Sequence, residues 1–164
     1  MDETTLNQIA CSIPILGKHF AGVVPKNQIV NLPSAKLPLC FIVNMDKYLE
    51  PGSHWIAVFV PTRDEIYYFD SFGIPPENDP YIMNILKSFN KSTLKYSTVQ
   101  IQPSLSSNCG LYCIYFLYLA INNYTMENCL NFFKHNYQLH TNDMLIKKLF
   151  AEILLRNNIS INAI

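Results

Sequence analysis

The strongest constraint on the fold of this chain is the six-residue run Trp55–Val60, which is apolar at every position. Successive side chains of a strand point to opposite faces of its sheet, so this run places hydrophobic groups on both faces. Such a pattern is typical of a central strand in a sheet that is covered on both sides. We therefore expect a layered core with this strand inside it.

A polar turn and the run Ile66–Asp70 follow this strand, which predicts an antiparallel hairpin. If the pairing is centred near Thr62 or Arg63, residue 70 or 71 lies opposite His54, and directly opposed side chains on one face are about 5 Å apart. His54 and Asp70 are then expected at the same end of the sheet. A slip of one residue would place the two side chains on opposite faces.

Helical and extended patterns elsewhere complete an α+β fold with an antiparallel or mixed sheet, and the length favours one domain, residues 1–164. The first helix is expected to have Thr4 or Thr5 as its N-cap and to end at residues 14–17. Asp79 is expected to cap a helix that starts at Pro80. The other expected elements are strands at 20–24, 37–43 and 94–101, and helices at 109–121, about 125–135 and about 141–157.

Composition argues against several classes of protein. Lys plus Arg and Asp plus Glu number 12 each, so no basic field is expected to bind nucleic acid. The longest apolar run, Leu111–Ile121, has 11 residues and is too short to cross a bilayer. The start of the chain lacks the pattern of a secretory signal, and five scattered cysteines do not suggest a disulfide framework. We expect a protein of a reducing compartment.

Two cysteines lie one helical turn apart at the start of the apolar run. Cys109 follows Ser and Asn residues that can cap a helix, and Gly110 after it permits close approach of the backbone. Free N–H groups and the helix dipole at this position favour a thiolate. Cys113 lies among apolar residues, which favour the neutral thiol. The two cysteines are therefore expected to differ in chemistry.

A nucleophilic thiolate needs a base and a group that orients the base, and His54 and Asp70 can supply these roles. Gln102, seven residues before Cys109, can offer a side-chain N–H group to an oxyanion beside the Cys109 N–H group. Each residue alone also has a structural interpretation: a packed cysteine, a core histidine, a turn former and a surface glutamine. Zinc is not expected, because Cys109 and Cys113 lack a second ligand pair at a recognised spacing, and a redox pair would favour C-x-x-C.

Three segments resemble the adenovirus-type endopeptidase family: G-S-H-W-I-A-V (52–58), Y-Y-F-D-S-F-G-I-P-P (67–76) and Q-P-S-L-S-S-N-C-G-L-Y-C-I-Y-F-L (102–117). The specific features are H-W at the start of a strand, the acidic residue in F-[DE]-x-[FY]-G, and Gln seven residues before Cys-Gly. SUMO-specific proteases and the proteases of Polinton/Maverick elements and virophages share this order. With F-A-G-V-V (20–24) and C-F-I-V-N (40–44), the resemblance covers about residues 20–120.

The resemblance implies a papain-like cysteine protease with its nucleophile at the N-terminus of the central helix. Cys109 would be the nucleophile, His54 the general base and acid, Asp70 the residue that orients His54, and Gln102 the oxyanion donor. Trp55 would lie near the histidine and the substrate, although core packing explains a strand tryptophan nearly as well. The family further implies cleavage of viral capsid or scaffold precursors at Gly-containing sites during virion maturation.

Under this reading the enzyme is a monomer without cofactor or metal, located in the virion and in the host-cell cytoplasm or viral factory. The adenovirus enzyme has glutamate where Asp70 stands, and the SUMO proteases have aspartate. No cysteine lies between Asp70 and Cys109, so the disulfide-linked activating peptide of the adenovirus enzyme is not expected, and neither is its DNA cofactor. The sequence is compatible with an activating peptide that binds without a covalent bond. The alternatives are a protease of ubiquitin-like modifiers and an inactive, protease-derived binding module.

Overall fold

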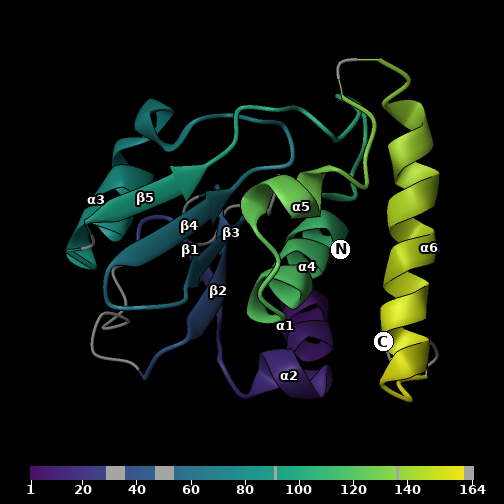
Figure 1. Ribbon diagram of the computed structural model, residues 1–164, viewed down its shortest axis with the longest axis horizontal. Coiled ribbons are helices and arrows are strands. Elements are labelled where there is room, and N and C mark those ends of the chain that lie inside the picture. The colour runs from purple at the N-terminus through teal and green to yellow at the C-terminus, as the bar shows by residue number, and fades with distance from the viewer. Residues whose placement is uncertain (29–35, 47–53, 91, 136, 161–164) are drawn as a thin grey trace.

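The structure, a computed structural model, describes residues 1–28, 36–46, 54–90, 92–135 and 137–160. Within these residues a mixed five-stranded sheet has helices on both faces (Figure 1), which confirms the predicted α+β class. Neighbouring strands follow chain order, antiparallel in the middle and parallel at both edges. The strands are β1 (Phe20–Pro25), β2 (Leu39–Asn44), β3 (Trp55–Val60), β4 (Glu65–Phe69) and β5 (Thr93–Tyr96).

The central strand β3 is buried along its whole length, as predicted. Alternate residues from Trp55 onwards pack into the hydrophobic cluster on the face of helix α4 (Cys109–Ile121). Those from Ile56 onwards pack into a second cluster with helix α3 (Pro80–Ser88). Burial of one such side chain contributes about 1.5–3 kcal/mol, so both covering layers hold β3 in place.

Most of the helices lie on the face of the sheet that α4 covers, and α6 forms the outermost layer there (Figure 1). Nearly every residue of α4 is buried, because the sheet lies on one side and other helices lie around it. No helix in the described ranges is long and apolar enough to cross a membrane. The remaining helices are α1 (Glu3–Ser12), α2 (Pro14–Gly17), the 3₁₀ helix η2 (Pro76–Asn78), α5 (Met126–Leu130) and α6 (His140–Arg156).

Several predicted element boundaries are wrong. Asp2, and not Thr4 or Thr5, caps α1, because its carboxylate accepts a hydrogen bond from the Thr5 N–H group at 2.8 Å. Residues 14–17 form a separate short helix, and α5 ends at Leu130. Strand β5 stops at Tyr96, before the chain turns away to pair the N–H groups of residues 101 and 102 with the Ser71 carbonyl.

The hairpin of β3 and β4 is centred on Arg63, one of the two expected centres, but the residue expected opposite His54 is wrong. The pairs Ala57↔Phe69 and Phe59↔Tyr67 centre the hairpin on Arg63. Continued outward, this register would place Phe72 opposite His54, where residue 70 or 71 was expected. The chain turns at Ser71 and Phe72, directly after Asp70, so strand pairing does not continue that far, and the side chains of His54 and Asp70 meet at the end of the sheet.

Candidate active site

His54 and Asp70 are joined at one end of the sheet, where β3 begins and β4 ends. His54 Nε2 lies 3.0 Å from Asp70 Oδ1, and the Asp70 side chain is 1% exposed. An ionised carboxylate only accepts hydrogen bonds, so the Nε2–H group is the donor. This bond selects the tautomer of neutral His54 in which Nδ1 carries the lone pair.

The position of Asp70 is fixed by a tight turn. Asp70 Oδ1 also accepts from the Phe72 N–H group at 2.7 Å, and the Gly73 N–H group donates to the Asp70 carbonyl at 3.0 Å. Gly73 has a φ of 71°, and a Cβ atom there would lie 2.6 Å from the Thr98 carbonyl oxygen. A glycine is therefore required at this position. Asp70 is both the turn former and the partner of His54.

The charged form of His54 is favoured by its surroundings. Burial lowers the pKa of His54, but the hydrogen bonds and charges of Asp70 and Cys109 outweigh this effect and raise it to about 9. The Asp70 bond occupies Nε2, so Nδ1 is the ring atom available to the Cys109 thiol. Within the described residues Nδ1 makes no hydrogen bond of ordinary geometry, so the thiol contact is looser than the carboxylate contact.

Phe72 covers the imidazole and was not identified as a site residue from the sequence. Its ring centroid lies 4.8 Å from that of His54, with the planes tilted by 39°. The only signal for it was the aromatic position of the F-[DE]-x-[FY]-G pattern. Phe72 helps to keep the His54 side chain at 13% exposure, which limits the access of water to the imidazole.

Cys109 is the first residue of α4 and is nearly buried. The expected capping by a Ser or Asn side chain is not found: the N-cap Asn108 makes no side-chain hydrogen bond to the helix. The Leu111 and Tyr112 N–H groups donate to the Asn108 carbonyl at 2.9 and 3.2 Å, and no Asn108 side-chain bond satisfies the N–H groups of Cys109 and Gly110. Gly110 provides the expected close approach, because a Cβ atom there would lie 3.1 Å from a Leu6 methyl group.

Cys113 has a different environment, as expected. It is fully buried, and its Sγ donates a hydrogen bond to the Trp55 carbonyl at 3.3 Å. Burial is the main reason that the pKa of Cys113 is raised well above its ordinary value, and the charges of Cys109 and Asp70 add to it. Cys113 therefore packs helix α4 onto β3 as a neutral thiol.

Gln102 is fully buried and is not the surface residue of the structural interpretation. Its Oε1 accepts from Ser71 Oγ at 2.5 Å, and its Nε2 donates to the Ser106 carbonyl at 2.9 Å. These two partners fix the orientation of the Gln102 amide. The Ser106 carbonyl can only accept a hydrogen bond, so the NH₂ end of the amide faces it. Nε2 carries a second N–H group, but Gln102 has no exposed surface in this structure, so its role as oxyanion donor stays a prediction.

Trp55 is only 3% exposed and belongs to the hydrophobic cluster that faces α4. It therefore presents little surface to a substrate in this structure. The substrate-binding role of Trp55 stays a prediction.

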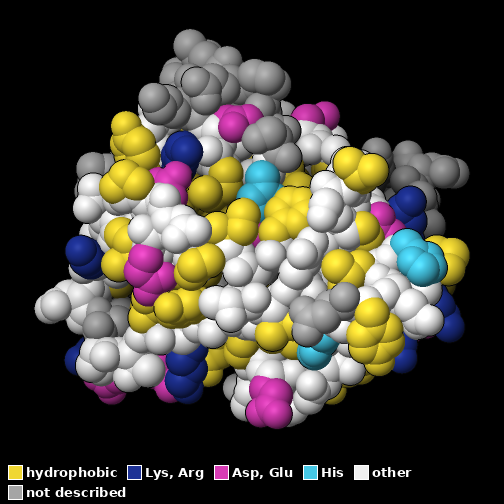
Figure 2. Space-filling model, turned by 90° about the horizontal axis from the view of Figure 1, so that it is seen from above, with side chains coloured by type: hydrophobic (Ala, Val, Ile, Leu, Met, Phe, Trp, Pro, Cys, Tyr) yellow, Lys and Arg dark blue, Asp and Glu magenta, His cyan; other side chains and the backbone are white. Residues whose placement is uncertain are grey.

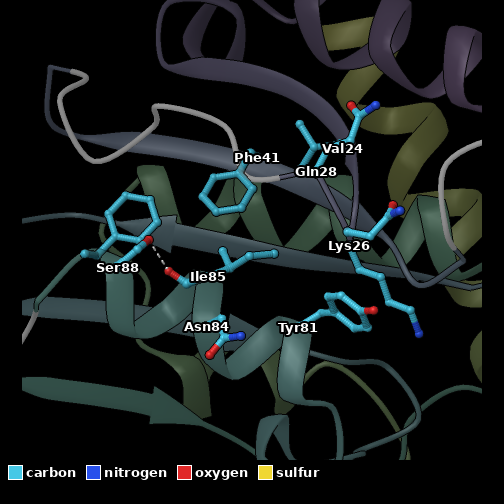
Figure 3. Close-up of a pocket in the computed structure, with 10 residues that line it drawn as sticks. Val24, Lys26, Gln28, Phe41, Tyr81, Asn84, Ile85 and Ser88 are labelled. Atoms are coloured by element: carbon cyan, nitrogen blue, oxygen red, sulfur yellow. Dashed lines mark hydrogen bonds between the residues drawn. The ribbon is translucent and has the colours of Figure 1, made fainter.

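A pocket of about 190 Å³ lies on the opposite face of the sheet, between β1, β2 and α3. Figure 3 shows Phe41 and Ile85 on facing sides of it, with Lys26 and Tyr81 near one end. None of the four candidate catalytic residues lines this pocket. In the described part of the chain no three His, Cys, Asp or Glu side chains are grouped as metal ligands would be.

A mixed sheet, a buried helix with an N-terminal thiol and a histidine–carboxylate pair together have the form of a cysteine protease. The family model for the adenovirus endoproteases matches residues 14–161. The chain belongs to this family of viral cysteine proteases, as the resemblance predicted.

Individual relatives agree with this assignment. A protein of Acanthamoeba polyphaga mimivirus, named as a thiol protease, is 32% identical over 100 residues, which is 55% of this chain and 32% of that protein. The protease of Bovine adenovirus B serotype 3 is 31% identical over 117 residues, 63% of this chain and 53% of that protein. The chain thus spans between a third and about half of the length of these relatives.

A solved structure extends the likeness of the fold. The central domain of an uncharacterized Legionella pneumophila protein has a TM-score of 0.54 and 11% identity, covering 94% of this chain and 97% of that domain. At this identity the likeness concerns the fold alone.

Proposed function

We propose that this protein is an endopeptidase with Cys109 as nucleophile, His54 as general acid and base, and Asp70 as the residue that orients His54. The observation that carries the proposal is the 3.0 Å hydrogen bond between His54 Nε2 and buried Asp70. It leaves Nδ1 to exchange a proton with the thiol, whose interaction helps to raise the pKa of His54. Membership of a protease family supports the same chemistry.

In the first half of the reaction, the Cys109 thiolate attacks the carbonyl carbon of a peptide bond, and the carbonyl oxygen becomes negatively charged. The Cys109 N–H group and the second Nε2–H group of Gln102 donate hydrogen bonds to this oxyanion. The protonated Nδ1 of His54 then gives its proton to the amide nitrogen as the C–N bond breaks. The products are a free amine and a thioester on Cys109.

In the second half, His54 Nδ1 takes a proton from a water molecule as the water oxygen attacks the thioester carbon. The same two donors hold the new oxyanion. When the C–S bond breaks, the carboxylic acid product leaves, and Cys109 and His54 return as the thiolate and the imidazolium. Asp70 keeps its hydrogen bond to Nε2 throughout, which holds the imidazole in place.

The substrates we propose are viral capsid or scaffold precursors, cut at Gly-containing sites during virion maturation in the virion or the host cell. Support comes from relatives in adenoviruses and in a mimivirus that are themselves named proteases. Acidic and basic side chains are spread around the edge of the face in Figure 2, and hydrophobic and uncharged groups with a histidine occupy its middle. Such a surface suits an uncharged polypeptide better than a nucleic acid.

The test compares two cysteines on one helix. Cys109→Ala is expected to abolish cleavage of a Gly-Gly peptide reporter and of a capsid precursor from the same genome. Cys113→Ala, the matched control one turn further on, should keep most of the activity because Cys113 only packs the core. An active Cys109→Ala protein, or a wild-type protein that cleaves neither substrate, would contradict the proposal.

A second experiment separates the substrate classes. Suicide probes made from ubiquitin or SUMO react with the nucleophile of enzymes that process these modifiers. We expect capsid precursor to be cut while the probes label Cys109 slowly. Rapid labelling together with an uncut precursor would replace the maturation role by the processing of ubiquitin-like modifiers.

A further inference from the structure

The segment from Ile101 to Asn108 carries Gln102 and leads directly into Cys109, yet it contains no helix or strand. It must therefore be held by its contacts. On one side the Ser71 carbonyl accepts the N–H groups of Ile101 and Gln102, each at 3.0 Å. The Ser71 hydroxyl donates to the Gln102 side chain. We call residues 101–108 the oxyanion loop.

Helix α6 holds the oxyanion loop from the other side through Asn142. This side chain is 1% exposed, and its Nδ2 donates to the Ile101 carbonyl at 2.7 Å and to the Lys134 carbonyl at 2.8 Å. Its Oδ1 accepts from the Lys134 N–H group at 2.9 Å. All three bonds go to backbone groups, so Asn142 ties the start of the loop and the segment before α6 to the helix.

Asp143, the next residue of α6, contacts the end of the oxyanion loop. Its Oδ1 accepts from Ser106 Oγ at 2.8 Å and from Tyr112 Oη at 3.2 Å. Burial, together with the charge of Asp143, raises the pKa of Tyr112, so the phenol stays a neutral donor. The carboxylate therefore joins the loop to the first turn of α4, the helix that begins with Cys109.

Ser106 connects Asp143 to both oxyanion donors. Its carbonyl accepts from Gln102 Nε2 at 2.9 Å, which directs the remaining Nε2–H group. Its hydroxyl, which donates to Asp143, accepts from the Asn108 N–H group at 3.2 Å, one residue before the Cys109 N–H group. A displaced Ser106 would therefore move both donors together.

We propose that Asn142 and Asp143 are positioning residues that set the oxyanion donors from helix α6, an inference that rests on the proposed function. Asn142 and Asp143 are not required to pack α6 onto the core, because apolar residues such as Ile146 and Ile153 make that contact. The two polar side chains add a defined orientation of the loop. Oxyanion donors act only when they lie within hydrogen-bond distance of the developing charge, so a small displacement of the loop lowers the rate.

The test uses Asp143→Ala, Asp143→Asn and the control Met144→Ala, which changes the exposed neighbour of Asp143 on the same helix. Two rates are measured on each protein: turnover of the Gly-Gly peptide and alkylation of Cys109 by iodoacetamide. Alkylation forms no oxyanion, so it reports the thiolate alone. Asp143→Ala should lower kcat by about 10- to 100-fold, with KM and the alkylation rate within about twofold of the wild type.

Asp143→Asn keeps an acceptor for the two hydroxyl groups and should retain kcat within about threefold, and Met144→Ala should match the wild type. Ser106→Ala removes the link from the other end and keeps the Ser106 carbonyl, so it should reproduce the loss of Asp143→Ala. This second variant tests the inference if Asp143→Ala does not fold. The double variant should be no worse than either single one.

The inference is overturned if peptide turnover survives in Ser106→Ala and Asp143→Ala, or if turnover and alkylation fall together, which would mean general damage to the site. In both cases an active wild type leaves the proposed function intact. A wild-type protein that alkylates at Cys109 but cleaves no peptide would instead overturn the proposed function, and this inference with it.

Discussion

Asp70→Asn tests most directly how the candidate site holds its charge. Asparagine keeps the shape of the side chain and an oxygen that accepts from His54, but it removes the negative charge. Burial lowers the pKa of His54, yet the bonds and charges of Asp70 and Cys109 raise it from an ordinary 6.5 to about 9. This difference corresponds to a preference of about 3 kcal/mol for the imidazolium form.

Without the Asp70 charge, burial works against the imidazolium and only Cys109 opposes it. We expect the pKa of His54 to fall by about one unit or more, which corresponds to at least about 1.4 kcal/mol. Turnover needs the proton of His54 for the leaving amine, so the alkaline limb of the kcat profile should move from about pH 9 to lower pH. The stability that the raised pKa contributes is fully present below pH 6.5 and is lost as the pH rises through about 9.

NMR titration of the histidine ring signals measures the shift directly, and His54→Gln identifies the signal. Asp64→Asn is the matched control, because it removes an exposed carboxylate from the turn of the same hairpin. It should leave the titration of His54 unchanged. The reasoning is refuted if His54 titrates near 6.5 in the wild type, or if Asp70→Asn moves its pKa by less than about half a unit.

Two further predictions concern stability near the site. Gly73→Ala forces a side chain into a left-handed conformation and against the Thr98 carbonyl, so it should cost about 2 kcal/mol or more and lower the thermal midpoint by about 4–8 °C; an unchanged midpoint in a calorimetric scan would contradict this. Asp79→Ala should cost about 1–2 kcal/mol in urea unfolding, because Asp79 caps α3 and pairs with Lys26 at 2.9 Å. Burial opposes the lowered pKa of Asp79, but Lys26 and the helix N–H groups prevail, so this stabilisation is present above pH 3.8 and is lost as the pH falls below it; a cost that stays constant into acid would disprove the assignment.

The parts of the fold that the sequence predicts are those whose local pattern matches their burial. The apolar run of β3 requires two covering layers, and the structure has both. Asp79 followed by Pro80 starts α3 as predicted, because a capping carboxylate and a proline in the first turn favour the same boundary. The change from polar loop to apolar run likewise predicts the start of α4 at Cys109.

The wrong predictions arise where several local solutions are nearly equal in energy. Asp2, Thr4 and Thr5 can each cap a helix, and only the structure selects Asp2. A polar hairpin loop fits more than one register, so the pairing centred on Arg63 was not distinguished from its neighbours. Strand β5 ends early because its partner β4 ends at Phe69, one residue after the last pair Tyr68↔Tyr96, and the sequence of residues 94–101 does not show where this distant partner stops.

In the candidate site, too, some residues were predictable from the sequence and others were not. Cys109, His54, Asp70 and Gln102 were predicted as site residues because their motifs resemble those of a known family. The groups that support them form bonds across long stretches of chain: Ser71 with Gln102, Ser106 with Asp143, and Ile101 with Asn142. Serine and asparagine are common at surfaces and in loops, so their residue type alone does not indicate these roles.

The turn after β4 binds both the proposed base, His54, and the proposed oxyanion donor, Gln102. Asp70 holds His54, and Ser71, the next residue, holds Gln102 through its hydroxyl and two backbone bonds. Gly73 keeps this turn against the Thr98 carbonyl. Because residues in one hydrogen-bonded network couple by about 0.5–3 kcal/mol, a change that shifts the turn affects proton transfer and oxyanion binding together. If the proposed roles hold, Asp70 and the oxyanion donors therefore belong to one hydrogen-bonded framework, which helix α6 supports from the opposite side.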